Sequence, residues 1–525
     1  MGGSTSRGFD GVLERARKRA GTPTVSGRFH RLPKRLLHDY LLERTILGTG
    51  YNGAVRLATN KQNGQKVAVK CFKLVGTSDH QKADLESECE VFLQMDHPHV
   101  ARLVDVYESE TQLDLVMECL GGGELFKRVA EKKRFTEHDA RDVSWQMLLA
   151  INYIHGHNVV HRDIKLENFL FDADGSNHLK LIDFGFSKMW KPNTTMALSC
   201  GTLSYVAPEV IKKNYTSQCD MWSFGVTIFI VLFGYMPFAG PEKIQCDRIL
   251  AGNYLKRDKY WSMVSQDAQD LVTKLLVVDP KKRLTSKQAL EHKWIKKRDQ
   301  LERTTSLADE STASALVDFA SASQFRRAAM HMMAWSLTNE ERAQVRRSFI
   351  DMDVTRTGTI TASEFKQVLE ERFHISDDEA SEAFRALDAN NQNEIHYSEF
   401  LAAMVSSRIK IHDDLLLTAF KRFDTDNSGS ITKDNLRHVL GSSCSSELIE
   451  AMIRDVDCAN DGQISYQEFI SYLCDGRART EHQEAVVRVI DESAESRLQS
   501  TCFLKPRKHK GKIQRAAKPA CCELQ

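Results

Sequence analysis

Five polar side chains that could hold a phosphate and a divalent metal follow one another in a fixed order. Lys70 ends the apolar run VAVK, Asp163, Lys165 and Asn168 lie in HRDIKLEN, and Asp183 opens the tripeptide DFG. A lysine at the end of an apolar strand is costly to bury alone, so a phosphate partner explains its position. Asp163 would accept the proton of an attacking hydroxyl, and Lys165 would neutralise charge on the transferred group. Asn168 and Asp183 offer oxygens that Mg²⁺ accepts, so the set predicts phosphoryl transfer from a nucleotide.

A glycine-rich segment and a hinge complete the nucleotide pocket that this chemistry needs. LGTGYNGAV at residues 47–55 lets backbone amides approach phosphates, although a single glycine pattern also occurs in ordinary turns. The acid that pairs with the strand lysine should come from the next helix, which offers Glu86, Glu88 and Glu90, and the distance to the following His-Pro turn favours Glu88. Met117 precedes the hinge and should narrow the back of the pocket. The residues expected at the ATP site are Leu47, Gly48, Thr49, Gly50, Gly53, Val55, Ala68, Lys70, Glu88, Met117, Glu118, Leu120 and Leu170.

The ordered set resembles the eukaryotic protein kinase family over residues 40–295. The resemblance implies that Glu209 of the APE motif pairs with a buried Arg283 and that Asp220 braces the catalytic loop. It also places Glu124 where basophilic kinases read an arginine three residues before the target, the alternative being an acid favoured by a helix N-terminus. A pseudokinase would have lost catalytic residues, and this chain keeps them.

An internal repeat follows the kinase-like region. A loop that begins with aspartate recurs at Asp353, Asp388, Asp424 and Asp457, at intervals of 35, 36 and 33 residues, with isoleucine at the eighth position of each loop. A fixed period of this size marks a repeated supersecondary unit, and oxygen side chains at alternate positions are typical of EF-hand calcium loops. The candidate calcium ligands are Asp353, Thr355, Thr357, Thr359, Glu364, Asp388, Asn390, Gln392, Glu394, Glu399, Asp424, Asp426, Ser428, Ser430, Asn435, Asp457, Asp461, Gln463 and Glu468.

Every loop departs somewhere from the ideal ligand pattern. The first has the neutral Thr355 and Thr357 at its third and fifth positions. The second has Asn393 in place of glycine, a residue that tolerates the left-handed turn. The third ends in Asn435 rather than glutamate, and the fourth has Ala459 at its third position. We expect at least two loops to bind calcium, with one or two of the others serving as helix-loop-helix spacers.

Kinase, junction and calcium loops in this order resemble the calcium-dependent protein kinases of plants and protists. Strand-like runs followed by long helical patterns predict an α+β bilobal kinase fold, and the repeat predicts an all-α EF-hand domain after it. The resemblance implies a monomeric enzyme that uses ATP, Mg²⁺ and Ca²⁺ and phosphorylates serine or threonine in protein substrates. The expected boundaries are a basic N-terminal extension at 1–38, the kinase domain at 40–295, an autoinhibitory junction at 296–337, the EF-hands at 338–475 and a basic tail at 476–525.

The junction contains a helical stretch, QFRRAAMHMMAWSL, that suits a calcium switch. At low calcium the junction would inhibit the kinase, and calcium would make the EF-hand domain grip this helix, with methionine as the adaptable element. The alternative is a helix packed permanently on one lobe. RTTS at residues 303–306 has basophilic spacing, so autophosphorylation is predicted at Ser306. One apolar face of the helix can be formed by Phe325, Ala329, Met332, Met333 and Leu337.

Composition and the chain ends predict where the protein acts. A net charge of +1 gives no general attraction to nucleic acid, and twelve cysteines without metal-ligand spacing indicate reduced thiols in the cytosol. No apolar run approaches the length that spans a bilayer. The basic ends favour an acidic membrane surface, the alternative being solvated tails. Gly2 fits N-myristoylation, and Cys522 fits a prenylation box except that Glu523 is not aliphatic, so we expect a cytoplasmic protein held at a membrane.

Three functions are compatible with these patterns. The first is a calcium-activated kinase, and the second is a kinase whose degenerate loops have lost calcium control. The third is a calcium-sensing scaffold without catalysis.

Overall fold

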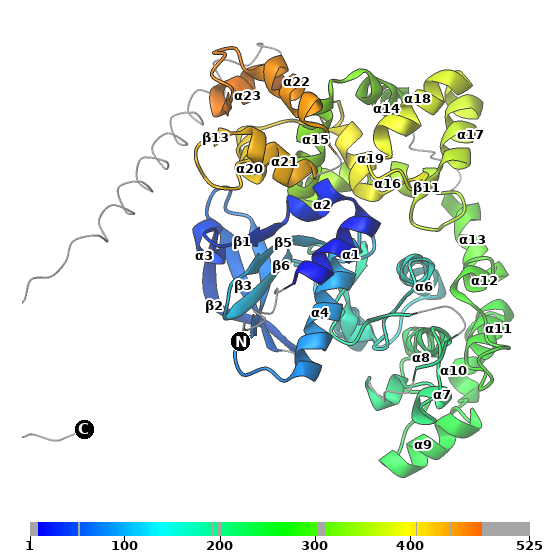
Figure 1. The fold of residues 1–525 in the computed structure, drawn as a ribbon. Helices are drawn as coiled ribbons and strands as arrows, with labels where there is room; N and C mark the ends of the chain where they lie inside the picture. The colour runs from blue at the N-terminus through cyan, green and yellow to red at the C-terminus, as the bar shows by residue number, and fades with distance from the viewer. Residues whose placement is uncertain are drawn as a thin grey trace, which may run out of the picture.

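The computed structural model describes residues 9–50, 53–190, 194–196, 201–302, 310–405, 407–441 and 444–474. In these residues a sheet-rich lobe is followed by a helical lobe and then by paired helix-loop-helix units, which confirms the predicted fold class. Figure 1 shows the helix-loop-helix units packed along one side of both lobes, with the loop of β11 near α13 and α21 above the sheet.

The N-terminal lobe is built on one six-stranded sheet. Its elements are β1 Phe29–Arg31, α3 Leu36–Asp39, β2 Tyr40–Gly50, β3 Gly53–Asn60, β4 Lys66–Lys73, α4 Asp79–Gln94, β5 Leu103–Glu108 and β6 Gln112–Glu118. The strand order is β1-β5-β6-β4-β3-β2, and β1 is parallel to β5 while the other pairs are antiparallel. Ser78 begins α4 with a capping box that satisfies the first free amides of the helix.

The C-terminal lobe is mostly helical and is centred on α8, whose residues after the first are all buried. Glu209 and Arg283 form a buried ion pair at 2.6 Å in this lobe. Its elements are α5 Leu125–Lys132, α6 Glu137–Gly156, β7 Val159–Val160, a 3₁₀ turn Leu166–Asn168, β8 Phe169–Phe171, β9 Leu179–Leu181, β10 Lys188–Met189, a 3₁₀ turn Leu203–Tyr205, α7 Pro208–Ile211, α8 Gln218–Phe233, α9 Glu242–Ala251, α10 Asp258–Trp261, α11 Gln266–Leu275, α12 Ser286–Leu290 and α13 Lys293–Glu302.

The C-terminal third forms one hydrophobic cluster that includes both junction helices. Its elements are α14 Glu310–Ser321, α15 Gln324–Ser336, α16 Asn339–Met352, β11 Ile360–Thr361, α17 Ala362–Phe373, α18 Asp377–Leu387, β12 Glu394–Ile395, α19 Tyr397–Met404, α20 Asp413–Phe423, β13 Ser430–Ile431, α21 Lys433–Leu440, α22 Ser446–Val456, β14 Ile464–Ser465 and α23 Tyr466–Leu473. Short antiparallel bridges pair the loops, Ile360 with Ile395 and Ile431 with Ile464. The repeated isoleucines therefore join the four loops into two pairs.

The described part of the N-terminal extension is not a free tail. Residues 10–20 form α1 and residues 22–26 form α2, and both pack on the rest of the molecule before β1 joins the sheet. The spacing of Phe9, Val12, Leu13 and Ala16 explains this, because the four side chains share one helical face and all are buried.

The expectations of reduced cysteines and of no membrane-spanning segment can be compared with the described residues. The eight cysteines among them form no disulfide bonds. None of the helices in this part of the chain has the length and apolar composition needed to cross a membrane.

Candidate active site and calcium loops

The Lys70 ammonium is buried between two carboxylates. Its Nζ lies 2.6 Å from Oε1 of Glu88 on α4 and 3.3 Å from Oδ1 of Asp183. Burial alone would lower the pKa of Lys70, but the charges of Glu88 and Asp183 outweigh it and raise the pKa. The lysine therefore stays charged, and of the three acids offered by the sequence it is Glu88 that α4 delivers.

The catalytic-loop side chains converge on Asp163. Lys165 Nζ lies 2.6 Å from Oδ2 of Asp163, and Asn168 Nδ2 donates to the same carboxylate at 3.1 Å and to the Asp163 carbonyl at 2.8 Å. Thr202 Oγ1 donates to the other carboxylate oxygen at 3.3 Å. Because Asn168 uses its amide hydrogens in this way, its carbonyl oxygen is oriented away from Asp163 and can serve as an acceptor or metal ligand.

Asp220 fixes the backbone of this loop from the helical lobe. Its carboxylate accepts hydrogen bonds from the backbone amides of His161 at 2.9 Å and Arg162 at 2.8 Å, and it lies 2.8 Å from His155 Nε2. Arg162 needs this support because its φ of 69° is unfavourable for a residue with a side chain. Asp220 thus lies where the sequence pattern predicted a brace.

A row of rings links the catalytic loop to α4. The ring of His161 lies 5.2 Å from Phe184 of the DFG segment, and Phe184 meets Phe92 of α4 edge-on at 4.9 Å. Glu88 and Phe92 are four residues apart on α4, so the ion pair and the ring contact lie on the same face of the helix. Both contacts depend on one orientation of α4.

The sheet register brings the predicted nucleotide residues together. Val55 lies opposite Lys70, Ala68 lies opposite Met117, and the glycine-rich turn runs from Gly48 on β2 back along β3. For ATP and Mg²⁺, the residues present fit: Asn168 and Asp183 supply an amide and a carboxylate oxygen.

The Glu118 side chain differs from the expectation for a nucleotide site. Its carboxylate is buried on the far side of the hinge, 2.6 Å from Lys180 Nζ and 2.6 Å from Arg342 of α16. These two cations, together with hydrogen bonds, outweigh burial and lower the pKa of Glu118. Only its backbone remains available to a nucleotide, and the side chain connects the kinase to the C-terminal third.

Glu124 stands at the N-terminal boundary of α5, and its carboxylate is 3.6 Å from Lys127. Its side chain is one-third exposed. The position therefore allows both predicted roles, an acid near a helix N-terminus and an acid that faces a substrate.

The four calcium loops share one hydrogen-bond pattern. In each, the first aspartate accepts the backbone amides of the fifth and sixth positions: Asp353 accepts Thr357 and Gly358 at 2.9 and 2.8 Å. Asn393 takes a φ of 59°, so it performs the turn that glycine makes in the other loops. The first aspartates of the remaining loops bond in the same way through Asp388, Asp424 and Asp457.

The acids of these loops are crowded in a way that suits a cation. Burial, together with the charge of Glu364, raises the pKa of Asp353 to about 7, and burial raises the pKa of Glu399 well above its usual range. Groups of three or more His, Cys, Asp or Glu that could hold a metal on their own do not occur among the described residues. The donor set therefore fits Ca²⁺ with help from hydroxyl, amide and carbonyl oxygens, as EF-hand loops use them.

The third loop departs from the others at its twelfth position. Asn435 Oδ1 accepts the amide of Thr432 at 3.0 Å, and Nδ2 donates to Thr425 Oγ1 at 3.0 Å. In the first loop, Glu364 instead accepts two backbone amides, that of Thr355 with one carboxylate oxygen and that of Thr361 with the other. Asn435 preserves the fold of the loop but offers only one oxygen.

The EF-hand units enclose the junction helix α15. All five residues of its predicted apolar face are buried, and Phe325 contacts the rings of Phe423, Phe469 and Tyr472. α15 packs against α19 of the first loop pair and α20 of the second. One helix is thus held by both halves of the EF-hand domain.

The EF-hand domain also docks on the side of the kinase that carries the hinge. Arg342 reaches Glu118, Arg422 lies 3.0 Å from Asp105, and Arg102 donates to the Ala334 carbonyl of α15 at 2.8 Å. These arginines carry no local sequence signal, since isolated basic residues are usually solvated. They were not among the predicted functional residues.

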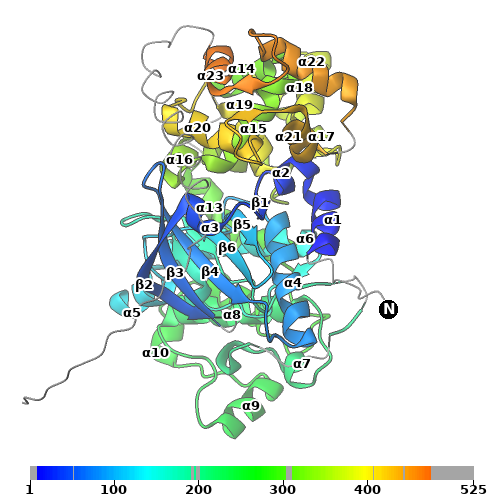
Figure 2. The ribbon, with the colours of Figure 1, turned by 60° about the vertical axis from the view of Figure 1, so that its left-hand side comes forward.

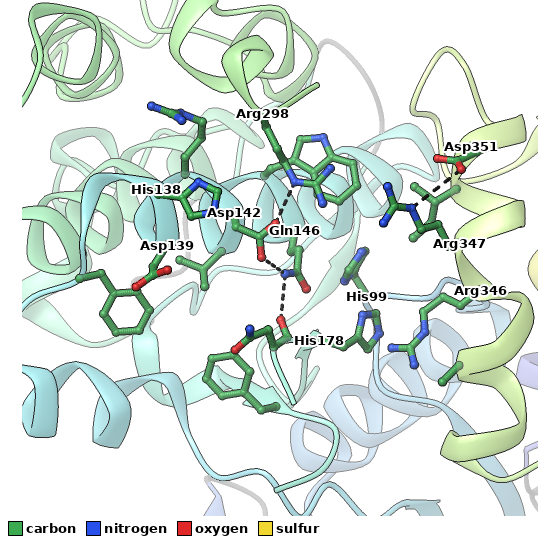
Figure 3. A pocket seen from close by; sticks show the side chains of 18 of the residues that line it. His99, His138, Asp139, Asp142, Gln146, His178, Arg298, Arg346, Arg347 and Asp351 are labelled. Carbon is green, nitrogen blue, oxygen red and sulfur yellow. Dashed lines mark hydrogen bonds and ion pairs between the residues drawn. The ribbon is translucent and has the colours of Figure 1, made fainter. Parts of the chain in front are cut away.

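Figure 3 shows a cavity of about 800 Å³ at this interface, between α5, α6 and α13 of the kinase and α16 of the EF-hand domain. Arg298 pairs with Asp142 at 2.8 Å, and Arg347 pairs with Asp351 at 4.0 Å. Arginine and lysine side chains outnumber aspartates in the cavity wall by eight to three, so the cavity is a positively charged part of the interface and is separate from the Asp163 site.

Comparisons with known proteins agree with both halves of the chain. Residues 41–295 match the model of the protein kinase domain, and residues 342–405 and 413–474 match that of the EF-hand domain pair. The chain is 33% identical to calcium-dependent protein kinase 5 of Plasmodium falciparum over 445 residues, 83% of this chain and 78% of that protein. It is 36% identical to calcium-dependent protein kinase 7 of Arabidopsis thaliana over 451 residues, 83% of each chain.

The geometry around Asp163 generates a first prediction. We expect Asp163→Asn to lower kcat for peptide phosphorylation about 10²- to 10⁴-fold, because the amide cannot accept the hydroxyl proton. Steady-state phosphate transfer to a serine peptide measures the loss. Asp174→Asn, at an exposed position of the same lobe, is the control and should keep wild-type activity. Equal kcat for Asp163→Asn and wild type would contradict the assignment.

Proposed function

Because this chain belongs to the calcium-dependent protein kinase family, we propose that it transfers the ATP γ-phosphate to serine or threonine of proteins when calcium binds its EF-hands. The family membership rests on relatives that are 33–36% identical over about four-fifths of the chain. The observation that carries the proposal is that α15 shares a hydrophobic core with the EF-hands, whose Arg342 forms an ion pair with the hinge residue Glu118.

The catalytic residues act around a nucleotide whose Mg²⁺ ions neutralise the phosphate charge. Lys70, held by Glu88, would neutralise the inner phosphates, and Asn168 and Asp183 would hold the metal. Asp163 orients the substrate hydroxyl and accepts its proton, and Lys165, whose Nζ lies 2.6 Å from the Asp163 carboxylate, stabilises the transferred group. All these side chains lie at the junction of the two lobes, so the relative position of the lobes governs catalysis.

Calcium controls kinase activity by deciding whether the junction helix α15 is bound by the EF-hand domain or is free to inhibit the kinase. In the docked arrangement, the apolar face of α15 is buried inside the EF-hand domain, and the contacts of that domain reach Arg102, Asp105 and Glu118 rather than Asp163. Without calcium, the loops lose the cation that offsets their crowded carboxylates, and their grip on α15 weakens. The released junction then inhibits the kinase, as the resemblance predicted.

Phosphorylation with and without calcium tests this function. We predict that the full chain phosphorylates a basic serine peptide about 5- to 150-fold faster with Ca²⁺ than with a chelator, the range expected for coupled sites. The Asp163→Asn chain should be inactive in both conditions. Equal wild-type rates would instead indicate a calcium-insensitive kinase, and no activity together with a calcium-dependent mobility shift would indicate a scaffold.

Substrate preference is proposed to depend on Glu124, whose partly exposed carboxylate can pair with an arginine three residues before the target. Glu124→Ala should lower kcat/KM for such a peptide roughly 10- to 150-fold, the effect of losing about 1.5–3 kcal/mol of charged hydrogen bonding. A peptide with alanine at that position should be phosphorylated equally by both enzymes. Glu131→Ala, an exposed acid on the same helix, is the matched control. An unchanged ratio between the two peptides would assign Glu124 to its helix alone.

Membrane attachment is proposed for the two chain ends, which lie outside the described residues. Gly2 would carry a myristoyl group and Cys522 a prenyl group, the second beside the basic residues of the C-terminal tail. We predict that labelling with a myristate analogue is lost in Gly2→Ala and that labelling with a prenyl analogue is lost in Cys522→Ser. Each variant should also have a larger soluble fraction, because the single lipid that remains binds a membrane only weakly. Undiminished labelling of either variant would reject that site.

A further inference from the structure

The first helix covers the outer face of α4. Phe9, Val12, Leu13 and Ala16 are buried in the same hydrophobic cluster as α4. Both Figure 1 and Figure 2 show α1 lying beside α4 and α2 lying beneath α21 of the EF-hand domain. The N-terminal segment, residues 9–31, therefore lies between the kinase lobe and the calcium domain.

Opposite faces of α4 are used by the active site and by α1. Glu88 faces Lys70, whereas Glu90, two residues later, lies 2.7 Å from Arg15 of α1. One turn further on, Gln94 accepts a hydrogen bond from Arg19 at 3.3 Å. A rotation of α4 that withdrew Glu88 from Lys70 would also break these contacts, so α1 resists that rotation.

Arg28 ties the end of α4 to the junction helix. Its guanidinium donates to the carbonyls of Leu93 and Leu103 at 2.8 and 2.9 Å, and it stacks on the ring of Trp335 at 3.7 Å. The side chain is fully buried, so these contacts are made away from water. A displacement of α15 would remove the ring that covers Arg28, and Arg28 would no longer be held against α4.

The same segment contacts two of the calcium-binding units. Gln392 of the second loop donates to the Arg19 carbonyl at 2.6 Å. Arg422 of α20, which precedes the third loop, donates to the Gly27 carbonyl at 2.9 Å. α2 packs on α21, which follows the third loop. The end of α1 and the residues after it thus have partners in the calcium domain.

We propose that residues 9–31 are a positioning element that couples the second and third EF-hands to α4, and through α4 to the Lys70–Glu88 pair. The inference rests on the proposed calcium-activated kinase and adds a direct path from the calcium loops to the catalytic lysine. Arg15, Arg19 and Arg28 are positioning residues, since they act on Glu88 through α4 and do not touch the nucleotide site.

The test compares full-length variants of one helix. Leu13→Asp places a charge in the α1–α4 contact, and Lys18→Asp places the same residue at an exposed position of α1. The readouts are KM for ATP and kcat at saturating Ca²⁺, and hydrogen exchange of residues 79–94 with Ca²⁺ and with chelator. We expect Leu13→Asp to raise KM for ATP at least about tenfold and to abolish the calcium-dependent protection of α4. Lys18→Asp and the conservative Leu13→Met should stay within about twofold of wild type.

A milder variant keeps the test decisive if Leu13→Asp does not fold. Leu13→Ala removes the same contact without burying a charge, and wild-type KM and α4 protection in this variant would overturn the inference. Arg28→Lys should raise the calcium concentration for half-activation about threefold or more, and an unchanged midpoint would overturn the coupling. A wild-type chain that ignores calcium would instead reject the proposed function, and the KM comparison at one calcium concentration would still decide whether α1 positions α4.

Discussion

The charge of Lys70 has to be neutralised inside the protein, and the acid that does so comes from a separate helix. A buried ammonium costs several kcal/mol unless it is paired, so Lys70 is held ready for phosphates only while Glu88 remains 2.6 Å away. The ring contact between Phe92 and Phe184 imposes the same orientation on α4 from its next turn. An element that packs on the other face of α4, such as α1, can therefore affect catalysis although it does not touch the nucleotide site.

Charged groups also define how the EF-hand domain docks. Glu118 is buried between Lys180 and Arg342, and Asp105 lies between Arg422 and His30. Burial lowers the pKa of Lys180 to about 7, which shows how much solvation these groups give up. Such pairs contribute little net stability because desolvation offsets their attraction. An arrangement that separates the partners is nevertheless strongly unfavourable, because it leaves a buried charge unpaired. Calcium binding that changes the docking free energy by a few kcal/mol can therefore form or disrupt an interface that is specific but only weakly favoured.

The sequence predicts those parts of the site whose residues are neighbours in the chain. HRDIKLEN and DFG identify Asp163, Asn168 and Asp183 because the chemistry is confined to a few neighbouring residues, and the position of the His-Pro turn was enough to select Glu88. The apolar face of α15 was predictable from helical spacing alone. The ion pairs of Glu118 and the contacts of Arg28 with Leu93 and Leu103 were not, because these partners are more than sixty residues away in sequence. A basic, amphipathic N-terminus looks the same whether it covers a membrane or covers α4, and only the fold distinguishes the two.

The departures in the calcium loops are best understood by separating the fold of a loop from its affinity. The first aspartate of each loop holds the amides of the turn, and the eighth-position isoleucines pair the loops, so neither function needs a perfect ligand set. Two seventh-position side chains bond across a loop pair, Thr359 donating to Glu394 and Ser430 to Gln463, which leaves only their carbonyls for calcium. Asn435 offers calcium one oxygen where glutamate would offer two, so we expect the third loop to bind calcium more weakly, whereas the fourth loop keeps Glu468 at this position. Because the two loops of each pair share a bridge, we expect calcium in the stronger loop to order the weaker one as well.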